Sequence, residues 1–124
     1  MVDNNPENIH RLFVEAFNVG DLESLVALYE PEARLLPQPG QVVSGHEAIR
    51  AVLQGFLAMA GTIRIDTQYV IHAGELALLR ARWHLAGVGP DGNPVEMQGN
   101  SAEVVRRQTD GNWLYLIDHP FGAD

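Results

Sequence analysis

The chain has 124 residues, 46% of them hydrophobic, and a formal net charge of -8, which fits a globular domain with a sizeable core. Acidic residues outnumber basic ones by 16 to 8, so the surface lacks the positive charge that binds nucleic acid or anionic membranes, and both are excluded as partners. The absence of cysteine excludes disulfides, thiolate nucleophiles and cysteine-ligated metal centres.

Targeting signals are not evident at the start of the chain. The segment Met1–Glu7 has neither the basic beginning nor the apolar core of a secretory signal. No apolar run approaches the roughly 20 residues that span a bilayer. We therefore expect a soluble, cytoplasmic protein that forms a single domain over residues 1–124.

Two amphipathic helices are predicted near the start of the chain. The first follows Asn5, a favourable N-cap, and its apolar face comprises Ile9, Leu12, Phe13, Ala16 and Phe17. Gly20 is expected to end this helix in a left-handed conformation, and Asp21 to begin the next. The apolar face of the second helix comprises Leu22, Leu25, Val26 and Tyr29. Glu30-Pro31 is expected to end it.

A loop and a third helix follow. Pro37, Pro39 and Gly40 predict a loop that extends to about Val43. Ser44 and Glu47 have the spacing of a capping box, which predicts a helix beginning at Ser44. The apolar face of this helix comprises Ile49, Val52, Leu53, Phe56 and Leu57.

The second half of the chain is predicted to form a β meander. Strands are expected over 62–73, 75–86 and about 95–108, and Asp110-Gly111 is a strong hairpin signal before a last strand. Helices first and strands afterwards indicate an α+β fold in which three N-terminal helices pack on one face of a curved, mostly antiparallel sheet. Such a fold encloses a cone-shaped cavity. Its other sheet face is left uncovered, so we expect a homodimer through the sheet.

Three segments resemble the nuclear-transport-factor-2-like superfamily, and within it the SnoaL-like polyketide cyclases and ketosteroid isomerases. Residues 17–29 are similar to the helix–Gly-Asp–helix opening of these proteins, and 44–50 to the entry into their third helix. Residues 110–120 are similar to their final strand, which carries a tryptophan. The resemblance implies the fold more strongly than a reaction, because this fold also serves ligand binding and assembly.

The isomerase chemistry of that superfamily is not expected here. By alignment, Phe13 stands where the isomerases have the tyrosine of their oxyanion hole, and Pro37 stands near the position of their general-base aspartate. Glu103 is the counterpart of their protonated acid. A site with one donor and no base does not isomerise steroids.

Glu103 and Asp118 are the leading catalytic candidates. If Asp110 and Gly111 form a two-residue turn, Glu103 lies directly opposite Asp118, and a longer turn would separate them. Two carboxylates in an apolar cavity cannot both ionise easily, so one becomes a general acid near neutral pH. Alternatively, both face solvent or a dimer partner and are neutralised by arginines. The candidates for that role are Arg80, Arg82, Arg106 and Arg107.

The histidines give weaker candidates. His119 ends the last strand and is expected on the face opposite Asp118, where it could assist as a proton shuttle. His84 shares a face with Arg80 and Arg82. The row is either an anion-binding wall for a carboxylate ligand or a set of residues that pair with glutamates across strands or across a dimer interface. His10 and His46 are expected at the surface. No histidine pair has metal-ligand spacing, so no metal is expected.

The functional hypothesis is that the protein binds a small apolar organic molecule in the cone-shaped cavity. Its expected ligand-binding wall comprises Phe13, Phe17, Tyr29, Phe56 and His84. Glu103, Asp118 and His119 would then serve an isomerase, cyclase or dehydratase that uses acid–base chemistry without a cofactor. The alternative is a non-catalytic ligand carrier or a dimerisation module, since residues 113–122 also resemble the last strand of the calmodulin-dependent kinase association domain.

Overall fold

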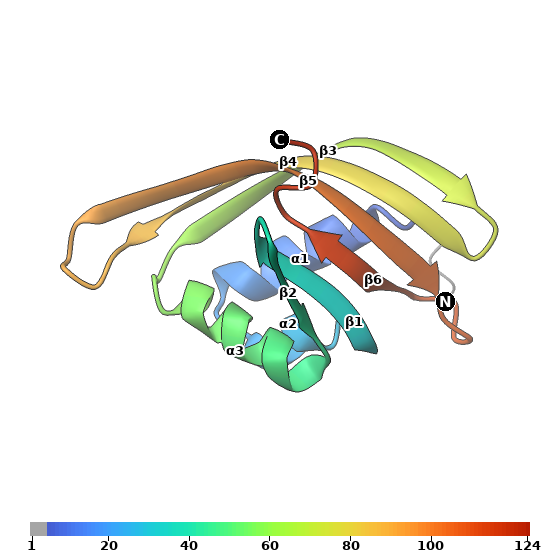
Figure 1. Ribbon diagram of the computed structural model, residues 1–124, viewed down its shortest axis with the longest axis horizontal. Coiled ribbons are helices and arrows are strands. Elements are labelled where there is room, and N and C mark those ends of the chain that lie inside the picture. The colour runs from blue at the N-terminus through green and yellow to red at the C-terminus, as the bar shows by residue number, and fades with distance from the viewer. Residues whose placement is uncertain (1–4) are drawn as a thin grey trace.

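A curved six-stranded sheet covers three helices in the computed structural model, which describes residues 5–124 (Figure 1). The helices are α1 (Asn8–Asn18), α2 (Leu22–Val26) and α3 (His46–Leu57). The strands are β1 (Tyr29–Gln38), β2 (Gln41–Ser44), β3 (Thr62–Ala73), β4 (Leu76–Val88), β5 (Pro94–Arg107) and β6 (Trp113–His119). Their order in the sheet is β2-β1-β6-β5-β4-β3, and β1 with β6 is the parallel pair in an otherwise antiparallel arrangement. The α+β fold with three helices therefore agrees with the sequence prediction.

The first two helices begin and end close to the predicted residues. Gly20 adopts a φ of +72° after α1, and the Asp21 carboxylate accepts a hydrogen bond from the Ser24 amide at the start of α2. Two details of the prediction are wrong. Tyr29 belongs to β1 and not to the second helix, and Leu12 is 39% exposed.

The predicted loop before the third helix is instead the β1–β2 hairpin. Pro39 and Gly40 form its turn, because proline fixes φ at the first central position and Gly40 supplies a φ of +83° at the second. The predicted capping box is also wrong, since Gly45 is the N-cap of α3 and no side chain caps it. The hairpin matters because β1 carries Tyr29 to the side of β6.

The turn before β6 is longer than the predicted two residues. The Gly111 amide donates to the Gln108 carbonyl, the Gln108 amide donates to the Asn112 carbonyl, and Gly111 has a φ of +88°. These bonds define a three-residue hairpin loop that ends in a left-handed glycine. Leu116 then forms a bulge, because Val105 pairs with Tyr115 while Val104 pairs with Ile117.

The bulge cancels the shift that the longer loop introduces. Glu103 therefore pairs with Asp118 and Ala102 pairs with His119, as the two-residue turn would have placed them. The predicted pairing is confirmed, but the reason given for it is wrong.

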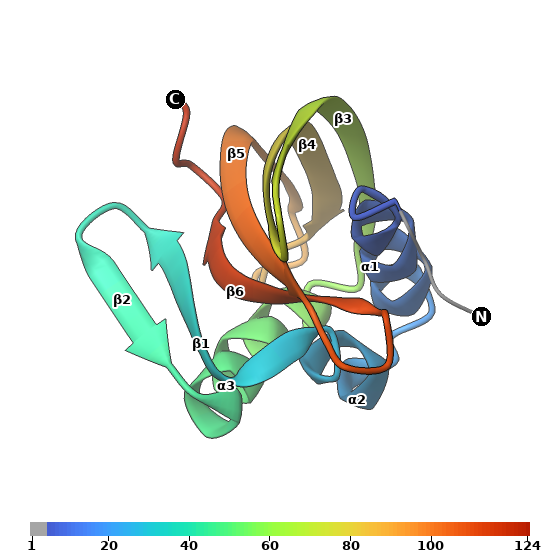
Figure 2. The same ribbon diagram turned by 90° about the vertical axis from the view of Figure 1, so that its right-hand side faces the viewer.

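The helices lie against the concave face of the sheet and leave its convex face uncovered by any described element (Figure 2). Alternate residues of β4 point inward and pack in the core: Ala77, Leu79, Ala81, Trp83 and Leu85. Apolar side chains on the convex face remain exposed, among them Tyr69, Ile71, Leu76 and Ile117. Within residues 5–124, no helix is both long and apolar enough to span a membrane.

Candidate functional site

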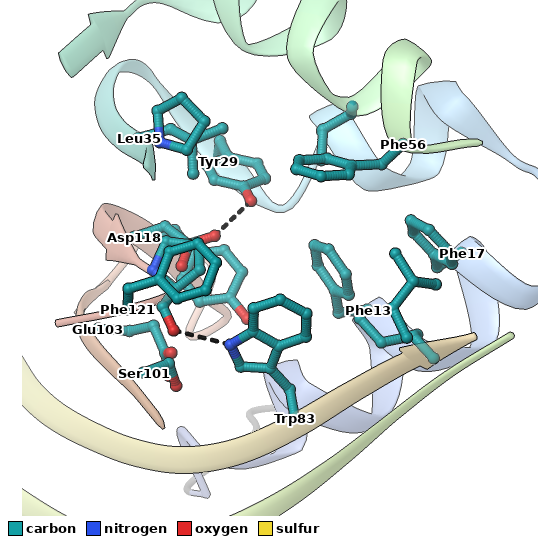
Figure 3. A pocket seen from close by; sticks show the side chains of 16 residues that line it. Phe13, Phe17, Tyr29, Leu35, Phe56, Trp83, Ser101, Glu103, Asp118 and Phe121 are labelled. Atoms are coloured by element: carbon teal, nitrogen blue, oxygen red, sulfur yellow. Dashed lines mark hydrogen bonds between the residues drawn. The ribbon is translucent and has the colours of Figure 1, made fainter. Parts of the chain in front are cut away.

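A pocket lies between the concave face of the sheet and the helices, and it holds about 650 Å³ of empty space when the solvent at its open mouth is included (Figure 3). Four of the predicted ligand-binding residues line it: Phe13, Phe17, Tyr29 and Phe56. Further apolar walls come from Leu35, Pro37, Leu53, Ile63, Trp83, Leu85, Pro120 and Phe121, and the lining residues with polar groups are Tyr115, Ser101, Glu103 and Asp118. The site is thus mostly aromatic and aliphatic, with a few polar groups.

Glu103 and Asp118 are the charged residues in this wall. They face each other across the β5–β6 ladder, and both side chains are buried, with exposures of 4% and 8%. Both lie on the concave face because Ser101, Glu103 and Val105 alternate inward along β5. The structure therefore brings the two leading candidates together inside the pocket.

Tyr29 holds the Asp118 carboxylate. Its hydroxyl donates a hydrogen bond to Oδ2 of Asp118 over 2.6 Å, from β1 to β6. Burial and the negative charge of Glu103 raise the pKa of Asp118 from 3.8 to about 7, against the opposing effects of the Tyr29 hydrogen bond and of His10. Asp118 can therefore both accept and release a proton near neutral pH.

His10 is the partner of Glu103, and the prediction that it lies at the surface is wrong. Its ring is 3% exposed, and Nε2 lies 2.6 Å from Oε1 of Glu103. Nδ1 lies 2.7 Å from the hydroxyl of Thr67 on β3. His10, Phe13 and Phe17 have the spacing i, i+3, i+7, which is the signal that could have placed His10 on the buried face of α1.

The arginines do not neutralise the two carboxylates in the way that the alternative prediction required. Arg106 makes a bidentate ion pair with Glu30, with distances of 2.8 and 2.5 Å. Arg80 donates to the backbone carbonyl of Ser101, and Arg107 lies 3.8 Å from Glu75. The reading of Glu103 and Asp118 as a solvated surface pair is therefore wrong.

Tyr115 lines the pocket and contributes a phenol, although it was not among the residues expected there from the sequence. Burial and the charges of Glu103 and Asp118 raise its pKa well above the usual value, so the phenol stays protonated. The bulge at Leu116 is why Tyr115 and Asp118 both point inward although three positions separate them. Without knowledge of the bulge, strand alternation puts them on opposite faces.

The remaining histidine candidates lie away from the pocket. His119 pairs with Ala102 and His84 with Gln98, both on the convex face, and neither lines the cavity. Nε2 of His84 lies 3.8 Å from the carboxylate of Glu96 on the neighbouring strand. His46 is half-buried and its Nε2 lies 2.7 Å from the Tyr29 carbonyl. Across the described residues, no three His, Asp or Glu side chains are grouped as metal ligands.

The C-terminal segment closes one side of the pocket. The indole Nε1 of Trp83 donates to the Pro120 carbonyl over 2.7 Å, and the Phe121 ring packs edge-on against Trp83 with centroids 5.4 Å apart. Residues that follow β6 are thereby fixed as pocket wall.

A family model described as a SnoaL-like domain matches residues 10–116. The chain belongs to the SnoaL-like domain family. The match includes His10, Glu103 and Tyr115, and it ends two residues before Asp118. The comparison with curated proteins found no match.

Solved structures share the fold of this SnoaL-like chain at low sequence identity. A ketosteroid isomerase-like protein from Erwinia carotovora atroseptica is 16% identical, with a TM-score of 0.78 over 91% of this chain and 89% of that one. A candidate dehydratase of the NTF2-like family from Streptomyces avermitilis is 21% identical, with a TM-score of 0.76 over 91% and 90%. A candidate calcium/calmodulin-dependent protein kinase II association domain from Xanthomonas campestris is 21% identical, with a TM-score of 0.79 over 91% and 81%. At these identities the likeness shows the fold alone.

Proposed function

We propose that this SnoaL-like protein binds a small, neutral, largely apolar organic molecule in the pocket and moves a proton to or from it without a cofactor. Asp118 is the group that exchanges the proton. The observation that carries the proposal is a buried carboxylate pair, Glu103 and Asp118, in the wall of an otherwise apolar cavity.

The chemistry that fits this wall is proton removal next to a carbonyl group. Asp118 in its ionised form accepts the proton from the α-carbon, which is the step shared by isomerisation of ketones, aldol cyclisation and dehydration of β-hydroxy ketones. The protonated carboxyl then returns the proton to a second carbon in an isomerisation, to the new alkoxide in a cyclisation, or to the leaving hydroxyl in a dehydration. The protonated phenol of Tyr115 is a hydrogen-bond donor for the oxygen on which negative charge develops. Anionic substrates are disfavoured because no basic side chain lines the described pocket.

Hydrogen exchange into a model ketone tests this proposal without knowledge of the natural substrate. The protein is incubated with 2-tetralone in D₂O, and loss of the α-proton signals is followed by NMR. We expect exchange above the buffer rate in the wild type and a loss of about 100-fold or more in Asp118→Asn, since acid–base groups contribute factors of this order. Asp66→Asn, which changes an exposed carboxylate on β3, is the matched control.

The outcomes separate an enzyme from a carrier. Exchange that persists unchanged in Asp118→Asn contradicts the role of this carboxylate. Ketone binding without any exchange, at the wild-type pocket, contradicts catalysis and favours the ligand carrier.

We further propose that the chain forms a homodimer through the convex face of the sheet. Support comes from its exposed apolar side chains, which include Tyr69, Ile71, Leu76 and Ile117, on a face that no described element covers. Soluble proteins rarely leave such a surface in contact with water.

A further inference from the structure

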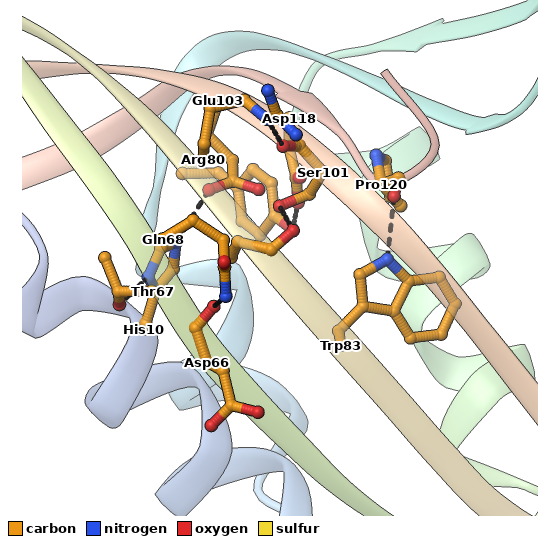
Figure 4. A network of polar contacts seen from close by, with 12 residues as sticks. His10, Asp66, Thr67, Gln68, Arg80, Trp83, Ser101, Glu103, Asp118 and Pro120 are labelled. Carbon is orange, nitrogen blue, oxygen red and sulfur yellow. Dashed lines mark hydrogen bonds and ion pairs between the residues drawn. The ribbon is translucent and has the colours of Figure 1, made fainter. Parts of the chain in front are cut away.

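The two carboxylates of the pocket differ in their hydrogen-bond partners. Glu103 has a basic partner, because Nε2 of His10 lies 2.6 Å from its Oε1 (Figure 4). Asp118 instead accepts a hydrogen bond from the neutral phenol of Tyr29 (Figure 3). His10 is not among the residues that line the cavity. His10 therefore influences the site through its contact with Glu103 and not as part of the cavity wall.

The second ring nitrogen of His10 contacts an exposed residue. Nδ1 lies 2.7 Å from the Thr67 hydroxyl, and Thr67 is an exposed residue on β3 although His10 is buried. The imidazole thus joins Glu103 on one side to the hydroxyl of an exposed β3 residue on the other. A carboxylate that accepts such a bond is stabilised in its charged form.

Among the ion pairs of the described residues, His10 is the basic partner of Glu103. The β6 strand contributes Asp118 and the phenol of Tyr115, both of which interact electrostatically with Glu103, as does Tyr29 from β1. Arg80 of β4 donates instead to the Ser101 carbonyl and to the Tyr69 hydroxyl. The Thr67 hydroxyl from β3 carries no charge.

We infer that His10 is a positioning residue: through its Nε2 contact it keeps Glu103 as the paired carboxylate, which leaves Asp118 as the one that exchanges a proton with the substrate. This inference rests on the proposed function. It adds that Glu103 and Asp118 have different roles, and that His10, which lies outside the cavity, determines which acid has which role.

The test is the titration of Asp118, followed through its side-chain carboxyl ¹³C shift in the full-length labelled protein without ligand. His10→Gln keeps an amide donor near Glu103 but cannot carry a positive charge. Since the charge of His10 favours the ionised form of Asp118, we expect the titration midpoint to move upward by roughly one pH unit. Glu103→Gln removes a negative neighbour, so the midpoint is expected to move downward by a similar amount.

Two further variants control the experiment. His72→Gln changes an exposed histidine of β3 and is expected to leave the midpoint where it is. Thr67→Val removes the second contact of His10 at an exposed position and is expected to raise the midpoint by a smaller amount than His10→Gln. If His10→Gln does not fold, Thr67→Val decides the question.

An unchanged midpoint in a folded His10→Gln protein overturns the inference. So does an unchanged midpoint in Thr67→Val when His10→Gln is unfolded. A purely structural His10 would lower the melting temperature without moving the midpoint. Because the readout is a titration, it is independent of ketone exchange, and a failed proposed function would show instead as exchange that survives Asp118→Asn.

Discussion

A carboxylate shielded from water and without a basic partner is costly to ionise, and Asp118 is in this position. Its side chain is buried beside Glu103, and its Oδ2 accepts a hydrogen bond from the neutral phenol of Tyr29. The pKa of about 7 that results is useful for proton transfer and unfavourable for folding. Stability and activity therefore conflict at this residue.

The conflict has a defined pH dependence. The pKa of Asp118 is about 7 in the folded protein and near 3.8 in the unfolded chain, so between these values the folded protein holds a proton that the unfolded chain has released. The stability that the folded protein gains from holding this proton on Asp118 is fully present below about pH 4, and it is lost as the pH rises through 7.

We expect Asp118→Asn to be more stable than the wild type at pH 8, by on the order of 2 kcal/mol, and to lose most of this advantage at pH 5. Urea unfolding at the two pH values measures the difference. Asp66→Asn is the control. A variant less stable than the wild type at pH 8 would contradict the burial cost assigned to Asp118.

The effect of Tyr29 on the pKa of Asp118 is opposite to the effect of burial. Its hydrogen bond lowers the pKa of Asp118, so Tyr29→Phe is expected to move the pH midpoint of ketone exchange above the wild-type value. The change is also expected to cost about 1 kcal/mol of stability through the lost hydrogen bond. A pH–rate profile checks the first effect, with Tyr69→Phe on the convex face as control. A midpoint that moves downward would show that Tyr29 does not stabilise the ionised form.

At the scale of elements, the last hairpin holds the site in register. Its glycine needs a left-handed conformation, whereas Gly55 lies inside α3 with no atom near an added Cβ. Gly111→Ala is expected to lower the free energy of unfolding by about 1 kcal/mol. Gly55→Ala is expected to raise it by a similar amount. Thermal unfolding measures both, and equal effects of the two changes would contradict the loop geometry.

The same hairpin shows what the sequence could predict. Asp110-Gly111 and the apolar runs on both sides were sufficient to predict a hairpin. The facing carboxylates were predicted correctly only because the bulge offsets the longer loop. The loop length and the bulge at Leu116 depend on how β6 packs between β5 and β1, and local sequence carries no signal for either. Tyr115 was therefore missed as a site residue.

The helices show a different limit. The spacing of apolar residues located the buried face of α1. That spacing could not include His10, because histidine is polar and is not counted among the apolar residues. His10 is buried because Glu103 and Thr67, distant in sequence, supply its hydrogen bonds. The β1–β2 hairpin was missed because two prolines suggested a loop. Pro39 lies in the turn, and Pro37 lies near the end of β1, past Leu35, which pairs with Asp118 of β6.

On the scale of the whole molecule, the curved sheet has two apolar faces and only one is covered by helices. A second copy of the chain would bury the convex face, and the polar residues Arg82 and His84 at one end of β4 would mark its border. Ile71→Lys places a charge in the exposed apolar area and is expected to convert a dimer into a monomer. Sedimentation velocity measures this, with Val42→Lys on β2 as a control at another exposed apolar residue. A wild-type protein that sediments as a monomer contradicts the proposed dimer.

The contact between Trp83 and the C-terminal segment gives the pocket a natural optical reporter. The chain has two tryptophans, and Trp83 lines the cavity while Trp113 packs against His72 and Arg107 outside it. A Trp113→Phe protein would emit from the pocket alone. A molecule that enters beside Phe121 would then change the intensity or wavelength of that emission, so unlabelled protein can be screened against chemical libraries before any reaction is known.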